Sequence, residues 1–391
     1  MNRANLICLI TVAASSLAFG EGASPAPTPA EAGIQKALAL IAKQPDHIPY
    51  YNALAMAYAR RARETSDVAF YQKAEDTVAK ALAMAPDDSE AMKVRVWLLL
   101  GRHEFQQALD AATPLNKKMP DDVTVYGYLA DANTELGNYA AAVNDIQWML
   151  RIKPGNIAGL TRAAYQRELH GDIPGALDLM QMAYDATPYQ EFEDRAWLLT
   201  QMSHLSLLGG DIPKAERFAT GALGLFPSYH YALAALAQVR LSQNRNDEAV
   251  ALLEQRYKAA PHAENLFSLA EALKRAGREK EAGQAFAAFE PLSLKESNIG
   301  DNSNHELMAY YVDDARQPAK ALEIAERELQ RRRDILTIDG YAWALAATGD
   351  YAKAYAEMQK VLAVGTKDPK IREHARVIAE RAAAVGKVSR S

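Results

Sequence analysis

Cysteine is almost absent from this chain, which has one cysteine, Cys8, among 391 residues. Disulfide bonds and cysteine-ligated metal centres are therefore excluded as sources of stability. The longest apolar run, residues 6–17, is short for a membrane span of about 20 residues. The formal net charge is −5 and no cluster of basic residues stands out. Because phosphate contacts need clustered Lys and Arg, we expect no nucleic-acid partner.

Motifs that carry catalysis are also missing. The eight histidines are scattered, with no pair at helical spacing, and neither a glycine-rich phosphate loop nor a nucleophile elbow is present. Residues 304–306 (Asn-His-Glu) could form a small polar site, but an exposed helix start is the favoured interpretation. The pairs 87–88 and 121–122 (Asp-Asp) could bind Ca²⁺, yet each follows a proline, where Asp commonly caps the next helix. We expect no metal, no cofactor and no enzymatic activity.

The first twenty residues predict a signal peptide. Arg3 gives a positive start, residues 6–17 form an apolar core, and residues 18–20 (Ala-Phe-Gly) offer small side chains at a cleavage site. Export with cleavage is favoured over membrane anchoring. Residues 21–30 then form a Pro/Ala-rich linker. We expect a periplasmic or secreted protein that is not inserted in the membrane after cleavage.

Alanine and proline recur with a fixed period. Successive alanines are 34, 34, 34, 39, 34, 33, 39 and 33 residues apart, and a parallel series of prolines shares the 34-residue step. The alanine series comprises Ala74, Ala108, Ala142, Ala176, Ala215, Ala249, Ala282, Ala321 and Ala354. A period of this length indicates an array of small units, each too small to bury its own apolar face.

One unit, residues 123–154, shows the pattern clearly. Tyr126 and Leu129 fall on one face of a first helix. Gly137 breaks that helix, because glycine tolerates a turn that would strain a side chain. A second helix follows and ends at Pro154, since the residue before proline is pushed out of helical conformation. The unit is therefore a helix–turn–helix with a small alanine where the two helices meet.

The repeated residues resemble the tetratricopeptide repeat (TPR) family. They are Leu129, Gly137, Tyr139, Ala142, Met149 and Pro154 in this unit. The resemblance implies an all-α fold, a right-handed α-solenoid of antiparallel helix pairs with capping helices at both ends. We expect a capping helix at 31–47, about nine units at 48–366, and a capping helix and tail at 367–391, the helix ending at Gly386.

Three places depart from the period. Extra residues lie near 60–69 and near 189–195, and a polar loop is expected at 291–304. Gly101 also stands two residues earlier than the period requires, and Asn244 replaces a turn glycine. Insertions in repeat arrays often map to one face, which is frequently the binding face.

The resemblance also implies that the first helix of each unit lines a concave groove that binds a ligand. The candidate groove residues are Trp97, Asp131, Tyr165, Trp197, His204, Tyr231, Gln238, Phe267, Glu271, Glu306, Tyr310, Asp339 and Trp343. Some of them, Trp97 and Trp343 above all, could instead pack between units. Aromatic side chains beside polar ones are typical of protein-binding surfaces. The acidic members favour a partner with apolar and basic side chains.

The hypothesis from sequence is thus a non-catalytic scaffold that binds a protein or peptide in its concave groove outside the cytoplasm. An alternative is a structural subunit of a cell-envelope assembly that uses its convex face or its caps. The sequence leaves the oligomeric state and the identity of the partner open.

Overall fold

A computed structural model describes residues 27–65, 67, 69–298 and 302–388. The predicted signal peptide and most of the predicted linker lie outside the described residues. Within the described part the chain is helical and contains no strand. This confirms the all-α fold.

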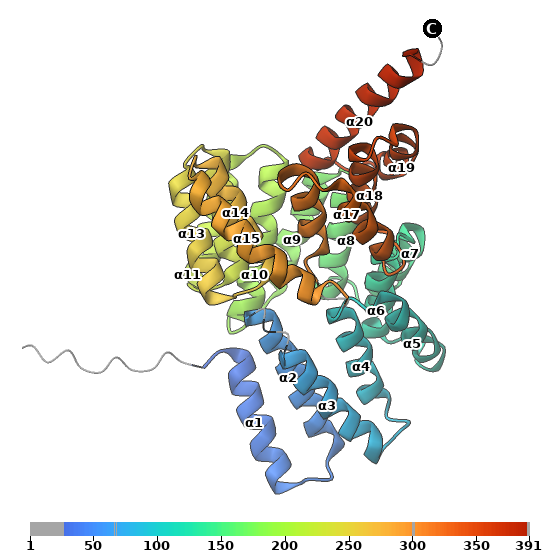
Figure 1. Ribbon diagram of the computed structural model, residues 1–391. Helices are drawn as coiled ribbons and strands as arrows, with labels where there is room; N and C mark the ends of the chain where they lie inside the picture. The colour runs from blue at the N-terminus through green and yellow to red at the C-terminus, as the bar shows by residue number, and fades with distance from the viewer. Residues whose placement is uncertain (1–26, 66, 68, 299–301, 389–391) are drawn as a thin grey trace, which may run out of the picture.

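Antiparallel helix pairs follow one another along the chain (Figure 1). The flanking helices are α1 (Pro29–Lys43) and α20 (Pro369–Val388). Between them the described residues form nine pairs: α2 (Ile48–Thr65) with α3 (Ala69–Met84), α4 (Ser89–Gly101) with α5 (Phe105–Lys118), α6 (Val123–Glu135) with α7 (Tyr139–Ile152), α8 (Ile157–Leu169) with α9 (Ile173–Ala186), α10 (Phe192–Leu208) with α11 (Ile212–Leu225), α12 (His230–Ser242) with α13 (Asn246–Ala259), α14 (Ala263–Arg275) with α15 (Glu279–Glu296), α16 (Asn304–Ala309) and the π-helical turn η1 (Tyr310–Asp314) with α17 (Pro318–Glu328), and α18 (Ile335–Ala347) with α19 (Tyr351–Val364).

The periodic alanines form a packing seam. Each of the nine is at most 2% exposed and lies on the second helix of its pair. A small side chain there allows the neighbouring helix to approach closely, and interiors of this density tolerate little added volume. The sequence period is therefore the period of helix contact.

A residue with positive φ stands five positions before each alanine from Ala108 onward. Five of these residues are glycines, and the other three are His103 (φ 57°), Asn244 (φ 60°) and Arg316 (φ 53°). The turn of the second unit is thus built on His103 and not on a glycine. Gly101 stands two residues earlier because it is the last residue of α4. Asn is among the residues that tolerate this conformation best.

The paired aspartates cap helices. The Asp88 carboxylate accepts a hydrogen bond from the Ala91 amide at 2.7 Å, and the Asp122 carboxylate accepts one from the Thr124 amide at 2.8 Å. Both bonds satisfy amides at the start of a helix. The capping interpretation is therefore confirmed over a Ca²⁺ site at these positions.

Three predicted helix boundaries were wrong. Helix α1 begins at Pro29, because Thr28 and Glu31 form a capping box ahead of the expected start. Helix α15 continues through Pro291 to Glu296, so the expected loop from 291 is helical in its first part; a hydrogen bond from Ser303 Oγ to buried Ser293 Oγ, 2.7 Å long, holds this added turn. Helix α20 passes Gly386, since a single glycine weakens a helix by only about 1 kcal/mol.

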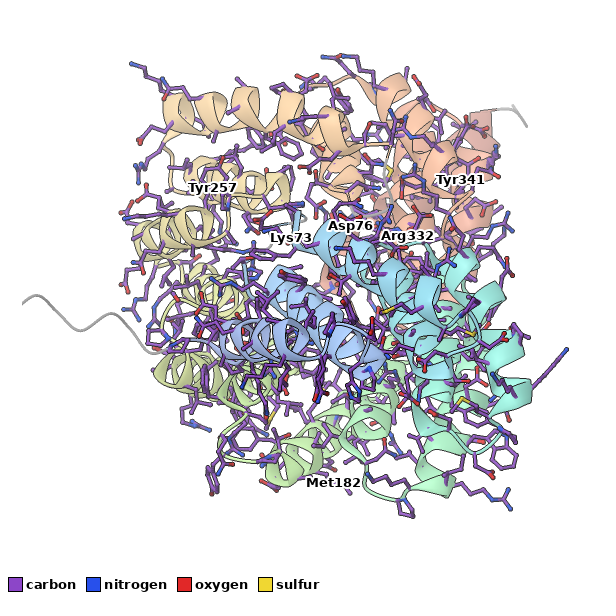
Figure 2. All side chains as sticks on the ribbon, turned by 90° about the horizontal axis from the view of Figure 1, so that it is seen from below. Lys73, Asp76, Met182, Tyr257, Arg332 and Tyr341 are labelled. Atoms are coloured by element: carbon purple, nitrogen blue, oxygen red, sulfur yellow. The ribbon has the colours of Figure 1, made fainter. Side chains whose placement is uncertain are left out.

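The array curls until its late units touch its middle ones. The Arg333 amide donates to the Glu135 carbonyl at 2.9 Å, and the Ile335 amide donates to the Tyr139 hydroxyl at 2.9 Å. Figure 1 shows α17–α19 beside α6–α8 accordingly. Seen from below, the N-terminal helices of the chain lie across a ring formed by the later helices (Figure 2).

A second closure joins α2 to α10. These helices have 18 and 17 residues, whereas α4, α6 and α8 have 13 each. The Arg63 guanidinium lies 2.6 Å from the Glu193 carboxylate, and that of Arg60 lies 3.1 Å from Glu191. We call these four residues and Asp194 the α2–α10 clasp. The extra residues predicted near 60–69 and 189–195 therefore meet each other.

Candidate functional site

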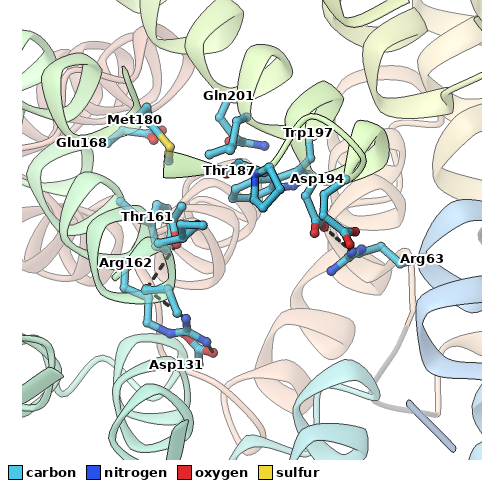
Figure 3. A pocket seen from close by; sticks show the side chains of 16 residues that line it. Arg63, Asp131, Thr161, Arg162, Glu168, Met180, Thr187, Asp194, Trp197 and Gln201 are labelled. Carbon is cyan, nitrogen blue, oxygen red and sulfur yellow. Dashed lines mark hydrogen bonds and ion pairs between the residues drawn. The ribbon is translucent and has the colours of Figure 1, made fainter. Parts of the chain in front are cut away.

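A cavity of about 690 Å³ lies among the first helices α6, α8 and α10 (Figure 3). We call it the large cavity, in contrast to a smaller one that adjoins it. The turn before α10, part of α9 and one residue of α2 complete its wall. The lining residues are Arg63, Asp131, Ile157, Ala158, Thr161, Arg162, Tyr165, Glu168, Met180, Thr187, Pro188, Glu191, Asp194, Trp197, Leu198 and Gln201. Its volume is typical of ligand-binding pockets.

Three predicted groove residues meet in this cavity: Asp131, Tyr165 and Trp197. Arg162 binds Asp131 in a forked arrangement, with Nε at 2.7 Å from one carboxylate oxygen and Nη2 at 2.5 Å from the other. This two-point pairing fixes both side chains in the wall. The predicted concave residues of three successive units thus form one surface.

The clasp closes one side of the large cavity, because Arg63, Glu191 and Asp194 belong to both. Glu193 lies behind them and is fully buried; its carboxylate accepts a hydrogen bond from the Tyr229 hydroxyl at 2.8 Å. Burial alone would raise the pKa of the Glu193 carboxyl, but the Arg63 charge and hydrogen bond lower that pKa below its ordinary value. The clasp therefore holds an ionised carboxylate inside the protein.

A smaller cavity of about 400 Å³, the inner cavity, adjoins the large one. The two share Asp131, Arg162 and Tyr165. The inner cavity lies where the array meets itself, so its wall combines middle and late units. Its lining residues are Leu100, His103, Phe105, Ala130, Asp131, Thr134, Glu135, Ile146, Arg162, Tyr165, Gln166, His305, Arg332, Asp334 and Leu336.

Ionisable groups in the inner cavity are strongly perturbed. Burial, together with the charge of Asp334, raises the pKa of the Glu135 carboxyl to about 8. Burial, together with the charge of Arg332, lowers the pKa of the His305 ring to about 3. His305 is thus held neutral, with Nε2 at 2.9 Å from the Thr337 hydroxyl. Perturbed groups of this kind cluster at functional sites more often than elsewhere.

Two candidate residues pack against the C-terminal helix instead of lining a cavity. The Trp343 ring stacks on His374 of α20 with centroids 4.2 Å apart, and its Nε1 donates to Asp313 at 2.9 Å. Asp339 is buried, with Oδ2 at 2.9 Å from His374 Nδ1. These contacts match the alternative interpretation of Trp343, that it packs between units.

Three further candidates also make structural contacts. Phe267 and Tyr310 belong to an aromatic cluster with Phe286 and Phe289, at centroid distances of 5.2–5.9 Å. Trp97 packs against two core clusters that together extend from α2 to α6. Aromatic contacts of this geometry stabilise a core beyond the area they bury.

Of the remaining candidate groove residues, three are exposed and two are not. His204, Gln238 and Glu271 are exposed at the same position of three successive first helices. Tyr231 packs on Tyr229 with centroids 5.4 Å apart. Glu306 lines neither cavity, and burial raises the pKa of its carboxyl to about 7. The candidates thus do not form one continuous groove.

The sequence pattern missed the residues that close the cavities: Arg63, Arg162, Glu135, Arg332 and Asp334. The extra residues near 60–69 were the one available signal for Arg63. The other four lie at repeat positions to which the resemblance assigns no part in binding, or come together only because the array curls back on itself.

The described residues offer neither a metal cluster nor a membrane span. They contain no group of three or more His, Cys, Asp or Glu placed to hold a metal ion. None of their helices combines the length and apolar character that crossing a membrane requires.

Comparisons with known proteins show the fold of this chain but identify no matching family model and no matching curated protein. Among solved structures, a chain of the APC/C hetero-tetramer Cut9–Hcn1 is 11% identical over 83% of this chain, with a TM-score of 0.51; the match covers 55% of that chain. The human IFIT1 dimer with m7Gppp-AAAA is 13% identical, with 85% of each chain covered and a TM-score of 0.50. Both are TPR proteins, and this chain has the TPR fold.

Proposed function

We propose that this chain is a non-catalytic scaffold that binds a protein or peptide segment on its concave side, outside the cytoplasm. The observation that carries the proposal is the large cavity, which first helices of three successive units line together. A TPR fold presents this side to partners in the family that the sequence resembles. The fold alone does not determine a function, so the proposal depends on the site.

The lining of the large cavity supports a partner with apolar and basic side chains. Trp197, Met180 and Leu198 supply apolar wall, and aromatic anchors in such pockets dominate binding energy. The acidic and basic lining residues are four carboxylic acids and two arginines: Asp131, Glu168, Glu191 and Asp194, and Arg63 and Arg162. An excess of carboxylates favours a basic segment over an acidic one.

Beyond the cavity, we assign His204, Gln238 and Glu271 to the same binding surface. They continue the row of Asp131 and Tyr165 along later first helices and are exposed. His204 Nε2 lies 2.8 Å from the Glu168 carboxylate, which links the row to the cavity wall. A segment that leaves the large cavity would therefore follow α10, α12 and α14.

Capture of the partner from the native exported fraction, after cross-linking, tests this proposal. Ala158 is exposed and lines the large cavity, so Ala158→Trp fills the cavity without disturbing the core. Ala158→Trp and Trp197→Ala should each weaken capture at least tenfold, because central aromatic contacts are worth about 2 kcal/mol or more. The control is Trp148→Ala, which removes a 39% exposed side chain on a second helix.

Loss of capture by Trp148→Ala with full capture by Ala158→Trp would contradict the concave proposal. That result would favour the alternative, a structural subunit of a cell-envelope assembly that uses its convex face. The export part is tested separately by N-terminal sequencing of the exported protein, which should begin after residue 20.

A further inference from the structure

We propose that the inner cavity binds one organic cation, a primary ammonium or guanidinium group on an aliphatic stem. The proposal rests on the proposed function in one respect: a bound segment in the large cavity would supply this group as a lysine or arginine side chain. A free small amine would satisfy the same chemistry. The inner cavity differs from the large one because late units contribute part of its wall: His305, Arg332, Asp334 and Leu336.

The charges in the inner cavity leave one carboxyl without a counter-charge. Arg162 is taken by Asp131 through the forked pair described above. Arg332 lies between two other carboxylates, with Nε at 3.6 Å from Glu328 Oε2 and 4.0 Å from Asp334 Oδ2. No hydrogen bond or ion pair joins the Glu135 carboxyl to any other residue in the described ranges. A bound cation would give the Glu135 carboxylate the counter-charge that it lacks.

Glu135 faces charged groups from every element around it. Asp131 lies on the same helix, Arg332 and Asp334 come from the turn before α18, and Arg162 from α8. The other titratable lining groups are Tyr165 on α8, His305 on α16 and His103 in the turn between α4 and α5. Its raised pKa follows from burial and from the negative charges of Asp334 and Asp131, which together outweigh Arg332. A cation beside the carboxyl would favour the ionised form and release the proton.

A buried acceptor on Gln166 points to the same ligand chemistry. Gln166 is 6% exposed and lines the inner cavity; its Nε2 donates to the Thr134 hydroxyl at 2.8 Å. Its Oε1 is buried, and no donor in the described part of the chain reaches it. Ammonium and guanidinium groups carry only donors, so one such group could serve both Gln166 Oε1 and the Glu135 carboxylate.

The apolar part of the wall favours an organic cation over a bare ion. Leu100, Phe105, Ala130, Ile146 and Leu336 line the cavity beside the polar groups. A volume of about 400 Å³ exceeds what a single ion needs and suits a carbon stem. Through the shared wall at Asp131, Arg162 and Tyr165, the stem could extend into the large cavity.

Titration calorimetry of the full mature protein tests the inner site. The probes are Nα-acetyl-arginine amide, Nα-acetyl-lysine amide and the neutral Nα-acetyl-norleucine amide. We expect the two cationic probes to bind at least tenfold more tightly than the neutral one at pH 7.5. Two buffers of different ionisation enthalpy should report proton release on binding.

Glu135→Gln should abolish both the preference for cationic probes and the proton release, because the amide has no charge to offer. Glu254→Gln, at an exposed position on α13, is the matched control and should bind like the wild type. Equal binding of all three probes, no binding of the cationic probes at millimolar concentration, or wild-type binding by Glu135→Gln would each overturn the proposal.

Agmatine distinguishes the two sources of the cation. If the ligand is free, agmatine should bind as tightly as the arginine amide; if it is a side chain, peptides containing arginine should bind more tightly than agmatine. The two proposals also fail separately. Probe binding without any captured partner would refute the scaffold alone, and partner capture without probe binding would refute the inner site alone.

Discussion

Arg63 and Glu193 are 130 residues apart in sequence, yet their charged groups lie 2.6 Å from each other across the array. Each belongs to a helix lengthened by extra residues, α2 and α10. The two insertions therefore extend one helix towards the other. Two irregularities that lie far apart in the sequence therefore form a single contact in the folded protein.

Arg63→Met should destabilise the N-terminal helices. It leaves the Glu193 carboxylate, which is fully buried, with the Tyr229 hydrogen bond and with the more distant Arg60, at 3.4 Å, as its counter-charge. Removing one partner of a buried pair typically costs about 3–5 kcal/mol; because Arg63 is about one-third exposed, we expect about 1–3 kcal/mol. Hydrogen exchange of α2 should accelerate and the melting temperature should fall.

The control for the clasp is Arg376→Met, which breaks exposed ion pairs on α20. Exposed pairs contribute little, so its effect should stay below about 0.5 kcal/mol. Equal effects of the two substitutions would show that the clasp does not hold α2 in place.

Ala176→Leu tests the packing seam. Ala176 is fully buried on α9, so a larger side chain should overpack the contact between helices and cost about 1–3 kcal/mol. Ala186→Leu, at an exposed position of the same helix, should change the melting temperature little. The seam assignment fails if both variants melt like the wild type.

Gly349→Ala tests the turn conformation alone. Gly349 has φ of 94°, and a Cβ added there would meet no atom within 4 Å. The expected loss of about 1–2 kcal/mol thus comes only from backbone strain. Gly224 has equally free space but lies in helix α11, where alanine should leave stability unchanged or raise it. Gly349→Ala should therefore lower the melting temperature clearly, whereas Gly224→Ala should leave it unchanged or raise it.

Glu135→Gln should stabilise the ligand-free protein relative to the wild type, and more so at high pH than at low pH. The pKa of this carboxyl is raised from 4.5 to about 8, so the folded state keeps a proton that the unfolded state has lost between these values. Wild-type stability contributed by Glu135 therefore falls as pH rises through this window. The variant should be about as stable as the wild type at pH 5 and about 1–3 kcal/mol more stable at pH 8.5. A difference that does not change with pH would mean that folding does not raise the pKa of the Glu135 carboxyl.

Much of the fold follows from local sequence. The spacing of the alanines predicts the helix pairs because each unit repeats the same contact with its neighbours. Asp88 and Asp122 cap helices as expected, since capping depends on residues only a few positions away. Helix ends were less predictable: α15 passes Pro291 because tertiary contacts at Ser293 hold the added turn.

The candidate site was predictable only in part. Asp131, Tyr165 and Trp197 come together because the repeat places them at equivalent positions of neighbouring units. Asp339 and Trp343 have similar positions, but α20 covers them. The inner cavity depends on contacts such as that from Arg333 to Glu135, which a local period does not encode. The sequence pattern therefore could not predict the contacts between units that are distant in the chain.

The most direct test of concave binding is site-specific photocross-linking in cells that produce the protein. A photoreactive phenylalanine at Gln201 would lie in the large cavity, and one at Tyr355 would lie on an exposed second helix. The account predicts a discrete cross-linked partner from position 201, lost with Ala158→Trp, and none from position 355. A partner cross-linked from position 355 and not from position 201 would contradict it.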